Sequence, residues 1–139
     1  MQISITNNRN RFILKSEILP ALKGIEIDYN KTIKSLGIII LSDEQLREIN
    51  IKHLKTDYYT DIITFDYAEN ESEIDGELCI SIDRIKENAK KYKISDKEEM
   101  YRVIIHGVLH LAGENDDKKE QQKRMQDKEN QYLKLICFT

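Results

Sequence analysis

Residues 95–113 of the chain read SDKEEMYRVIIHGVLHLAG, and this stretch predicts a core helix. Ser95 with Glu98 three residues later is the capping-box pattern that opens a helix. Apolar residues then recur at helical spacing, as they do on a helix that packs against a core. Gly113 follows the last of them and is typical of a helix C-terminus, because glycine readily takes the left-handed conformation found there.

The segments on either side predict a mixed fold. Alternating or β-branched runs indicate strands, and apolar residues three and four apart indicate helices. Pro20 falls near the first turn of the first helix, where a proline is tolerated. We therefore expect one α+β (mixed α/β) domain over residues 1–139, with a small sheet of about four strands and roughly five helices packed on it. The expected strands are residues 2–5, 37–41, 61–67 and 77–82, and the expected helices are residues 18–25, 42–53, 82–89, 95–113 and 117–136.

The composition is that of a charge-coated globular protein. Of the 139 residues, 40% are apolar and 34% are charged, and no run is long and apolar enough to span a bilayer. The N-terminal residues show neither a secretory signal nor a transit peptide, so we expect a cytoplasmic protein without membrane partners. The net charge of -3 argues against a broad nucleic-acid surface but allows a local basic patch. Cys79 and Cys137 lie in apolar contexts and are expected to be buried free thiols.

Two of the three histidines lie near the end of the core helix, as His106-Gly-Val-Leu-His110. Four residues turn a helix by about 400°, so both imidazoles project from one face, a single turn apart. A helix presents two nitrogen ligands to one metal ion in this way. The same spacing also arises by chance, so the interpretation depends on the residues around it.

Carboxylates follow the core helix where the chain is expected to turn back. After Gly113 the sequence reads Glu114-Asn-Asp116-Asp117, and one of these carboxylates would complete a site of three protein ligands. A fourth position left open for water is the plan of a catalytic zinc centre. The ligand set suits Zn²⁺, although nonhaem Fe²⁺ uses the same set. The acidic residues also suit the first turn of the next helix, a role compatible with ligation by one of them.

Gly107 separates this pattern from that of ordinary zinc peptidases. The motif His-Glu-x-x-His places a general base directly after the first histidine, where this chain has Gly107. A glycine inside a regular helix costs about 1 kcal/mol relative to alanine, so we expect another backbone or a substrate to approach closely there. The sequence thus predicts a metal-dependent hydrolase that is not a zincin protease.

The stretch from His106 to Gly113, HGVLHLAG, resembles the signature of the YbeY family of ribosomal RNA maturation factors. That signature reads His-Gly-x-x-His, then Leu-x-Gly, then a third His. By this spacing the third position falls on Asp116, so the resemblance implies an Asp in place of the His. Asp117 and Glu114 stay open as alternatives for the third ligand.

Two further segments resemble the same family. Residues 57–65, DYYTDIITF, are similar to its Asp-x-Pro-Thr-Asp-Val-Leu-Ser-Phe, and residues 76–81, GELCIS, resemble the strand that leads into its next helix. The family carries an arginine, thought to engage phosphate, where this chain has Leu54, and a proline where it has Tyr59. Lys55 is the expected substrate contact, although an ammonium group does not reproduce the guanidinium fork.

The resemblance implies a metal-dependent, single-strand-specific endoribonuclease that matures rRNA, with rRNA or a ribosomal subunit as partner and Zn²⁺ or another divalent ion as cofactor. No residue of the motif is an evident general base for such a reaction. Two alternatives stay open: a metallohydrolase acting on a peptide or small molecule, favoured by the acidic balance, and a ribosome-assembly module with a structural metal. The further candidates for RNA contact are Lys52, Arg84 and Arg102, with His53 as a residue that would line the cleft; each also suits an ordinary surface or structural role.

Overall fold

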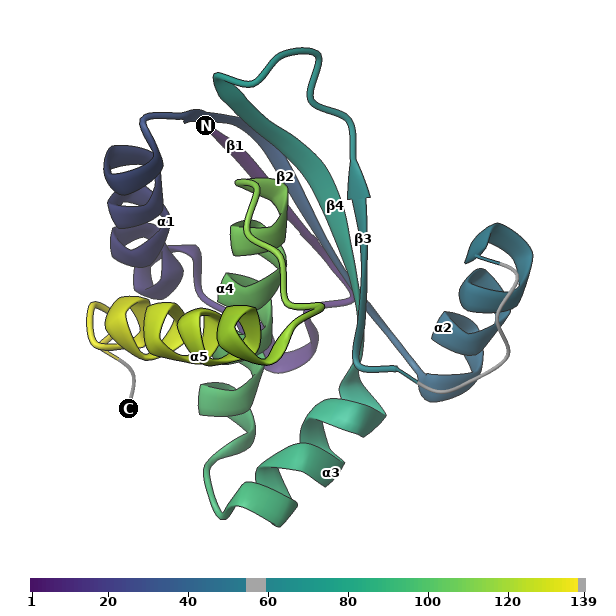
Figure 1. The fold of residues 1–139 in the computed structure, drawn as a ribbon. Coiled ribbons are helices and arrows are strands. Elements are labelled where there is room, and N and C mark those ends of the chain that lie inside the picture. The colour runs from purple at the N-terminus through teal and green to yellow at the C-terminus, as the bar shows by residue number, and fades with distance from the viewer. Residues whose placement is uncertain (55–59, 138–139) are drawn as a thin grey trace.

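A single four-stranded sheet organises the chain (Figure 1). The computed structural model describes residues 1–54 and 60–137. The strand order is β1-β2-β4-β3, in which β1, β2 and β4 run parallel and β3 is antiparallel to β4. The predicted mixed α/β class with one small sheet is therefore confirmed. The strands are β1 (Gln2–Thr6), β2 (Thr32–Leu41), β3 (Ile62–Asp66) and β4 (Glu73–Ser81).

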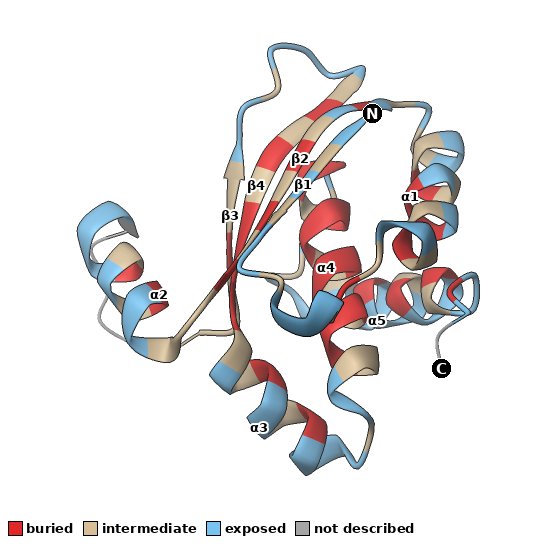
Figure 2. Ribbon diagram, turned by 180° about the vertical axis from the view of Figure 1, so that it is seen from behind, coloured by how far each residue is buried: buried red, intermediate tan, exposed pale blue. Residues whose placement is uncertain are grey.

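Helices cover one face of the sheet, whereas the other face carries α2. α1 and α4 lie on the covered side, α5 packs on α1 and α4, α3 continues from the end of β4, and α2 packs on the other face through Leu46 (Figures 1 and 2). Among the described residues, none of the helices combines the length and the hydrophobicity that crossing a lipid bilayer requires. The α-helices are α1 (Lys15–Tyr29), α2 (Asp43–Ile49), α3 (Ile82–Tyr92), α4 (Asp96–Leu111) and α5 (Lys119–Leu133), with a 3-10 turn η1 (Arg9–Arg11) and a π-helical segment η2 (Asn50–Leu54).

α4 is the centre of the core because it is apolar on nearly every side. It lies against β3 and β4 and against α1, α3 and α5, and most of its side chains are buried. Its N-terminus is capped, since the Ser95 hydroxyl accepts a hydrogen bond from the amide of Glu98 at 3.0 Å, which is one of the two hydrogen bonds of the predicted capping box. The capping box predicted at Ser42 and Gln45 is also present, at the start of α2.

The structure corrects several element limits. β2 begins at Thr32 and β4 at Glu73, earlier than predicted, because the two strands already pair there, with Ile33 and Ile74 opposite each other and both buried. α1 begins at Lys15, so Pro20 lies inside the helix rather than in its first turn. Cys79 is buried as predicted, but Cys137 is exposed, because α5 ends at residue 133 and the chain then leaves the core.

Gly107 lies where α4 meets the sheet. A Cβ atom built on it would come within 2.7 Å of both Ile62 Cδ1 and Leu78 Cδ2. The close approach predicted from the sequence is therefore present, but the neighbours are side chains of β3 and β4 rather than a backbone or a substrate. This contact sets the distance between the sheet and the turn of α4 that carries His106.

Gly107→Ala should lower the free energy of unfolding by about 1–3 kcal/mol, because overpacking outweighs the gain in helix propensity. Gly24→Ala in α1 is the matched control, since a Cβ there first meets Leu135 Cδ1 at 3.1 Å and Leu135 is 46% exposed, whereas the Leu78 side chain beside Gly107 is fully buried and has less room to move. Equilibrium unfolding in urea measures both effects. Equal effects at the two positions would contradict the close contact between α4 and the strands.

Candidate metal centre

His106 and His110 project together from the last turns of α4. Their Nε2 atoms are 3.1 Å apart, and their rings meet edge to face with centroids 4.6 Å apart. The side chains are 25% and 27% exposed, although the helix that carries them is otherwise largely buried. The spacing of four residues therefore places both imidazoles on one accessible face of α4, as predicted.

Gly113 turns the chain back over the end of α4. It has a positive φ of 109°, and the amides of Gly113 and Glu114 donate hydrogen bonds to carbonyls of the last helical turn, each at 3.0 Å. This reversal brings Asp116 Oδ2 to 3.4 Å from His106 Nε2 and 3.3 Å from His110 Nε2. A glycine suits this position because other residues rarely take a positive φ.

Three donor atoms, His106 Nε2, His110 Nε2 and Asp116 Oδ2, form a nearly equilateral triangle with edges of 3.1, 3.4 and 3.3 Å. We call them the donor triangle. Ligand atoms bound at about 2.0–2.1 Å to a tetrahedral zinc ion are about 3.3 Å apart, so the triangle matches one face of such a site. Within the part of the chain that the structure describes, these three residues are the group of His, Cys, Asp or Glu that could hold a metal ion.

The other two candidate carboxylates have different surroundings. Glu114 accepts hydrogen bonds from the Tyr29 hydroxyl at 2.7 Å and from Arg124 Nε at 3.1 Å. Asp117 is exposed and stands outside the donor triangle. Of the three carboxylates that follow the helix, Asp116 is therefore the one that the fold brings to both histidines.

Both imidazoles are oriented through their second nitrogen. His106 Nδ1 lies 2.7 Å from Glu129 Oε2, and His110 Nδ1 lies 2.9 Å from the carbonyl oxygen of Glu114. Each of these oxygens accepts a hydrogen bond, so the proton of a neutral imidazole belongs on Nδ1 and the Nε2 lone pair is free to bind a metal. Outer hydrogen bonds of this kind fix the ring orientation at metal centres.

Acidic neighbours favour the protonated form of His106 in the metal-free protein. Burial acts to lower the pKa of His106, but the hydrogen bond and charge of Glu129, with the charges of Asp116 and Asp61, outweigh it and raise the pKa. A proton and a metal ion therefore compete for the same nitrogen, which makes metal affinity dependent on pH.

Glu129 belongs to this site but was not predicted from the sequence. It comes from α5, yet only 6% of it is exposed, and it shares the buried stripe of that helix with Met125 and Tyr132. Its Oε1 lies 3.2 Å from Arg102 Nη1, while Arg102 Nη2 donates to Asn130 at 2.8 Å. The available signal was a charged residue on the apolar stripe of an otherwise polar helix.

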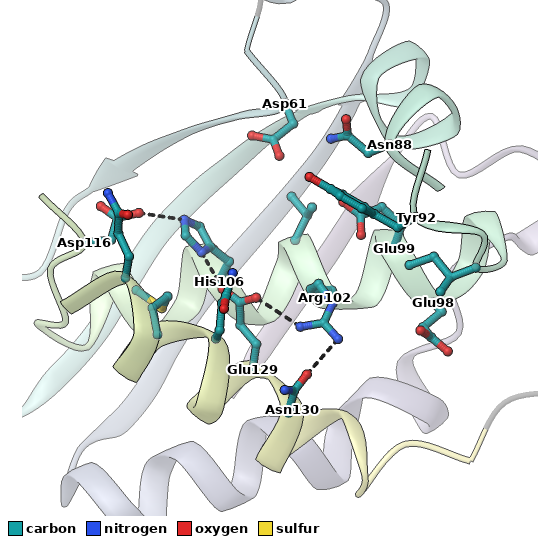
Figure 3. A pocket seen from close by; sticks show the side chains of 15 residues that line it. Asp61, Asn88, Tyr92, Glu98, Glu99, Arg102, His106, Asp116, Glu129 and Asn130 are labelled. Atoms are coloured by element: carbon teal, nitrogen blue, oxygen red, sulfur yellow. Dashed lines mark hydrogen bonds and ion pairs between the residues drawn. The ribbon is translucent and has the colours of Figure 1, made fainter. Parts of the chain in front are cut away.

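A cleft of about 570 Å³ opens beside the donor triangle, between α3, α4 and α5 (Figure 3). Arg102 is its one lysine or arginine among the described residues that line it. Burial raises the pKa of Asp61, against the opposing effect of His106. With one arginine and five carboxyl groups in its lining, the cleft is acidic. These carboxyl groups belong to Asp61, Glu98, Glu99, Asp116 and Glu129.

Of the two arginines predicted to contact RNA, one lies outside this cleft and the other is already paired. Arg84 lies outside the lining and pairs with Asp43, with Nη2 and Oδ2 3.1 Å apart. Arg102 does line the cleft, but Glu129 and Asn130 already engage its guanidinium group.

Other residues predicted to contact RNA or to line the cleft lie on η2 or just after it. His53 lies outside the lining of the cleft, and its ring meets the Phe65 ring edge-on with centroids 5.9 Å apart, which agrees with the structural role that the sequence also allowed. Lys52 is exposed on η2 and does not line the cleft. Lys55, with Asp57 and Tyr59, lies outside the described residues.

Comparison with known proteins covers nearly the whole chain. The family model described as Endoribonuclease YbeY matches residues 2–136. The chain belongs to the YbeY family. YbeY relatives named Endoribonuclease YbeY are 41% identical in Phocaeicola vulgatus, 46% in Azobacteroides pseudotrichonymphae and 40% in Chlorobium phaeobacteroides. The alignments cover 91%, 83% and 96% of this chain and 91%, 82% and 94% of the relatives, respectively.

A solved structure shares the fold of this YbeY family member. The solution structure of TM1509 from Thermotoga maritima superposes with a TM-score of 0.68 at 24% identity, over 96% of this chain and 87% of that chain. The family resemblance identified from the stretch between His106 and Gly113 is thus confirmed by the family model.

Glu99 lies in the wall of the cleft, two turns before His106 on α4. It is 3% exposed, and burial, with the nearby charge of Asp61, raises its pKa from 4.5 to about 7. Between these two values the folded protein holds a proton that the unfolded chain releases. The stability of the fold must therefore fall as the pH rises through this window.

Metal-free wild-type protein should lose on the order of 3 kcal/mol of unfolding free energy through Glu99 as the pH rises from about 4.5 to above 7. Glu99→Gln keeps the shape of the side chain without its charge, so it should remove this loss. Urea unfolding at about pH 5 and about pH 8 measures the change in unfolding free energy of each protein. His106 also titrates, but it does so in both proteins, so its contribution cancels when they are compared. A difference between the two proteins that does not change with pH would show that the Glu99 pKa is not raised.

Proposed function

We propose that this chain is a metal-dependent endoribonuclease that hydrolyses phosphodiester bonds of single-stranded RNA. The observation that carries the proposal is the donor triangle, in a member of a family whose curated relatives are named endoribonucleases. The proposed ligands are His106, His110 and Asp116. Zn²⁺ is the proposed ion, because two imidazoles and one carboxylate at tetrahedral spacing suit it. The proposed substrate is ribosomal RNA, in the cytoplasm.

The side chains around the donor triangle have defined tasks in this proposal. A bound divalent ion supplies Lewis acidity, which polarises a phosphodiester and makes a water molecule more acidic. Glu129 holds the His106 ring through Nδ1, and the backbone of Glu114 does the same for His110. Arg102 balances the charge of Glu129 and keeps that carboxylate turned toward His106.

The acidity of the cleft supports metal dependence. RNA phosphates are repelled by the carboxylates of the cleft, and Arg102 is already paired with Glu129. A divalent ion on the donor triangle reverses the local charge next to the scissile bond. Phosphate binding in the cleft therefore depends on the ion, and not on a basic surface.

His110→Ala and Asp116→Ala should each weaken zinc binding by more than about 100-fold, because each removes one of three ligands, and should abolish cleavage of a single-stranded RNA. Asp117→Ala is the matched control, since Asp117 is exposed and outside the donor triangle. Metal analysis of purified protein, with a gel assay on the same samples, measures both effects. Full metal content in His110→Ala and Asp116→Ala would show that the proposed site is wrong.

The same samples separate the alternatives. The core forms without any contribution from the donor triangle, so removal of the metal by a chelator should abolish cleavage and leave the far-ultraviolet circular dichroism unchanged. Unfolding on chelation would favour a structural ion instead. Cleavage of peptides but not of RNA by the zinc-loaded protein would favour a different metallohydrolase.

Glu129→Gln should weaken zinc binding by about 10- to 100-fold, because the orienting carboxylate makes the His106 ring a stronger ligand. Glu120→Gln on the exposed face of the same helix is the matched control. Competition with a zinc-sensitive fluorescent chelator measures the dissociation constants. Equal zinc affinity in the two variants would remove Glu129 from the metal site.

A further inference from the structure

The cleft extends well beyond the donor triangle. On α4 its lining residues Glu99, Val103 and His106 recur on one face, and α3 contributes Asn88 and Tyr92, one turn apart. Glu99 and His106 are seven positions apart on the helix, a distance of about 10 Å along the axis. The far part of the cleft is therefore close enough to hold a nucleotide whose neighbouring phosphate lies at the donor triangle.

Tyr92 offers an aromatic surface in this far part of the cleft (Figure 3). The side chain is 58% exposed, and among the large hydrophobic residues that are exposed in the described chain it is the one that lines the cleft. Lys91 Nζ lies 5.6 Å from the centre of its ring. Exposed aromatic rings beside a cationic side chain are the surfaces on which proteins stack unpaired bases.

Glu99 supplies a second, independent observation in the same part of the cleft. It is only 3% exposed, yet its Oε1 has no hydrogen-bond partner among the described residues. The amide of Asn88 interacts with the same carboxyl group. A buried acceptor without a donor is costly, so an acceptor of this kind in the wall of a cleft favours a ligand that carries an N–H group.

The charge of the cleft favours recognition through a base. Carboxylates outnumber the one arginine of the lining, and that arginine is engaged by Glu129. Contacts to phosphate, which usually dominate affinity for nucleic acids, are therefore scarce here away from the ion. Stacking and a hydrogen bond to a base edge do not need a positive surface.

We propose that this part of the cleft is a nucleobase site, in which one unpaired base of the RNA stacks on Tyr92 and donates an amino hydrogen bond to Glu99 Oε1. The inference rests on the proposed ribonuclease function and adds a substrate preference to it. The ligand class is a base with an exocyclic amino group: adenine, cytosine or guanine. Uracil fits less well, because the carbonyls that flank its N–H group would face the carboxyl group.

The nucleobase site also accounts for selectivity toward single strands. In a duplex the amino group of the base is engaged by its partner and both faces of the base are stacked. A base can reach Tyr92 and Glu99 only when its pairing edge and one face are free. Selectivity of this kind does not depend on the identity of the metal ion.

The test uses a short oligouridine RNA with one central 2-aminopurine, whose fluorescence falls when it stacks. Zinc-loaded protein and RNA are mixed by stopped flow, so that quenching is recorded before cleavage. Wild-type protein should quench the probe, whereas Tyr92→Ala should remove the quenching and weaken binding by roughly 5- to 150-fold. Tyr92→Phe should behave as wild type, because the ring is retained. Quenching by Tyr92→Ala equal to that of wild type would overturn the proposal.

Two controls complete the test. Tyr67→Ala removes another exposed tyrosine, 52% exposed and outside the cleft, and should leave quenching unchanged. Glu99→Gln should reduce the preference of the protein for oligouridines with a central adenine or cytosine over plain oligouridine, measured by competition. A preference unchanged in Glu99→Gln would overturn the assigned role of Glu99.

The outcome for the nucleobase site is distinct from that for the proposed function. A gel assay on unlabelled RNA reports cleavage by the wild type, and the fluorescence experiment reports stacking. Cleavage by wild type with no effect of Tyr92→Ala on quenching or KM would refute the nucleobase site alone. Quenching that depends on Tyr92, without cleavage by wild type, would refute the ribonuclease function and retain the nucleobase site.

Discussion

The packing of α4 between the sheet and three other helices fixes the position of the site. This helix is buried on nearly every side, and the contact of Gly107 with Ile62 and Leu78 sets its distance from the strands. His106 and His110 stand on its one accessible line, so neither backbone position can shift without disturbing the core. The proposed metal centre takes its rigidity from the hydrophobic core, because the core fixes the positions of both histidines.

Two segments that come later in the chain complete the site through contacts with α1. The turn after Gly113 is held by the hydrogen bond between the Tyr29 hydroxyl and Glu114, at 2.7 Å. α5 is held by the hydrogen bond between the Tyr132 hydroxyl and Asp28, at 2.6 Å. α1 thus anchors both the segment that delivers Asp116 and the helix that delivers Glu129. This arrangement explains how a largely polar helix such as α5 can place one carboxylate against His106.

The sequence predicts those parts of the structure that depend on local spacing. The two imidazoles on one face, the cap at Ser95 and the reversal at Gly113 all follow from contacts within a few residues. The early starts of β2 and β4 do not, because Thr32 and Glu73 are strand residues only through pairing with each other. Glu129 could not be assigned to the site from local spacing, since it meets His106 across 23 positions of the chain. The exposure of Cys137 likewise depends on where α5 leaves the core.

The charge of the site connects metal binding with substrate recognition. The signature that the chain resembles has a histidine at the position of Asp116, so Asp116 as the proposed ligand places an anion where that signature has a neutral side chain. With Glu129 on the other side, His106 has two carboxylates within 3.4 Å of its ring nitrogens. More negative charge attracts a cation more strongly, but it leaves a bound ion a weaker Lewis acid toward phosphate. Affinity for RNA must then depend more on stacking and on hydrogen bonds to a base than on contacts with phosphate. Tyr92, with its exposed ring, and Glu99, with an Oε1 that is unpartnered within the described residues, offer such contacts in the same cleft.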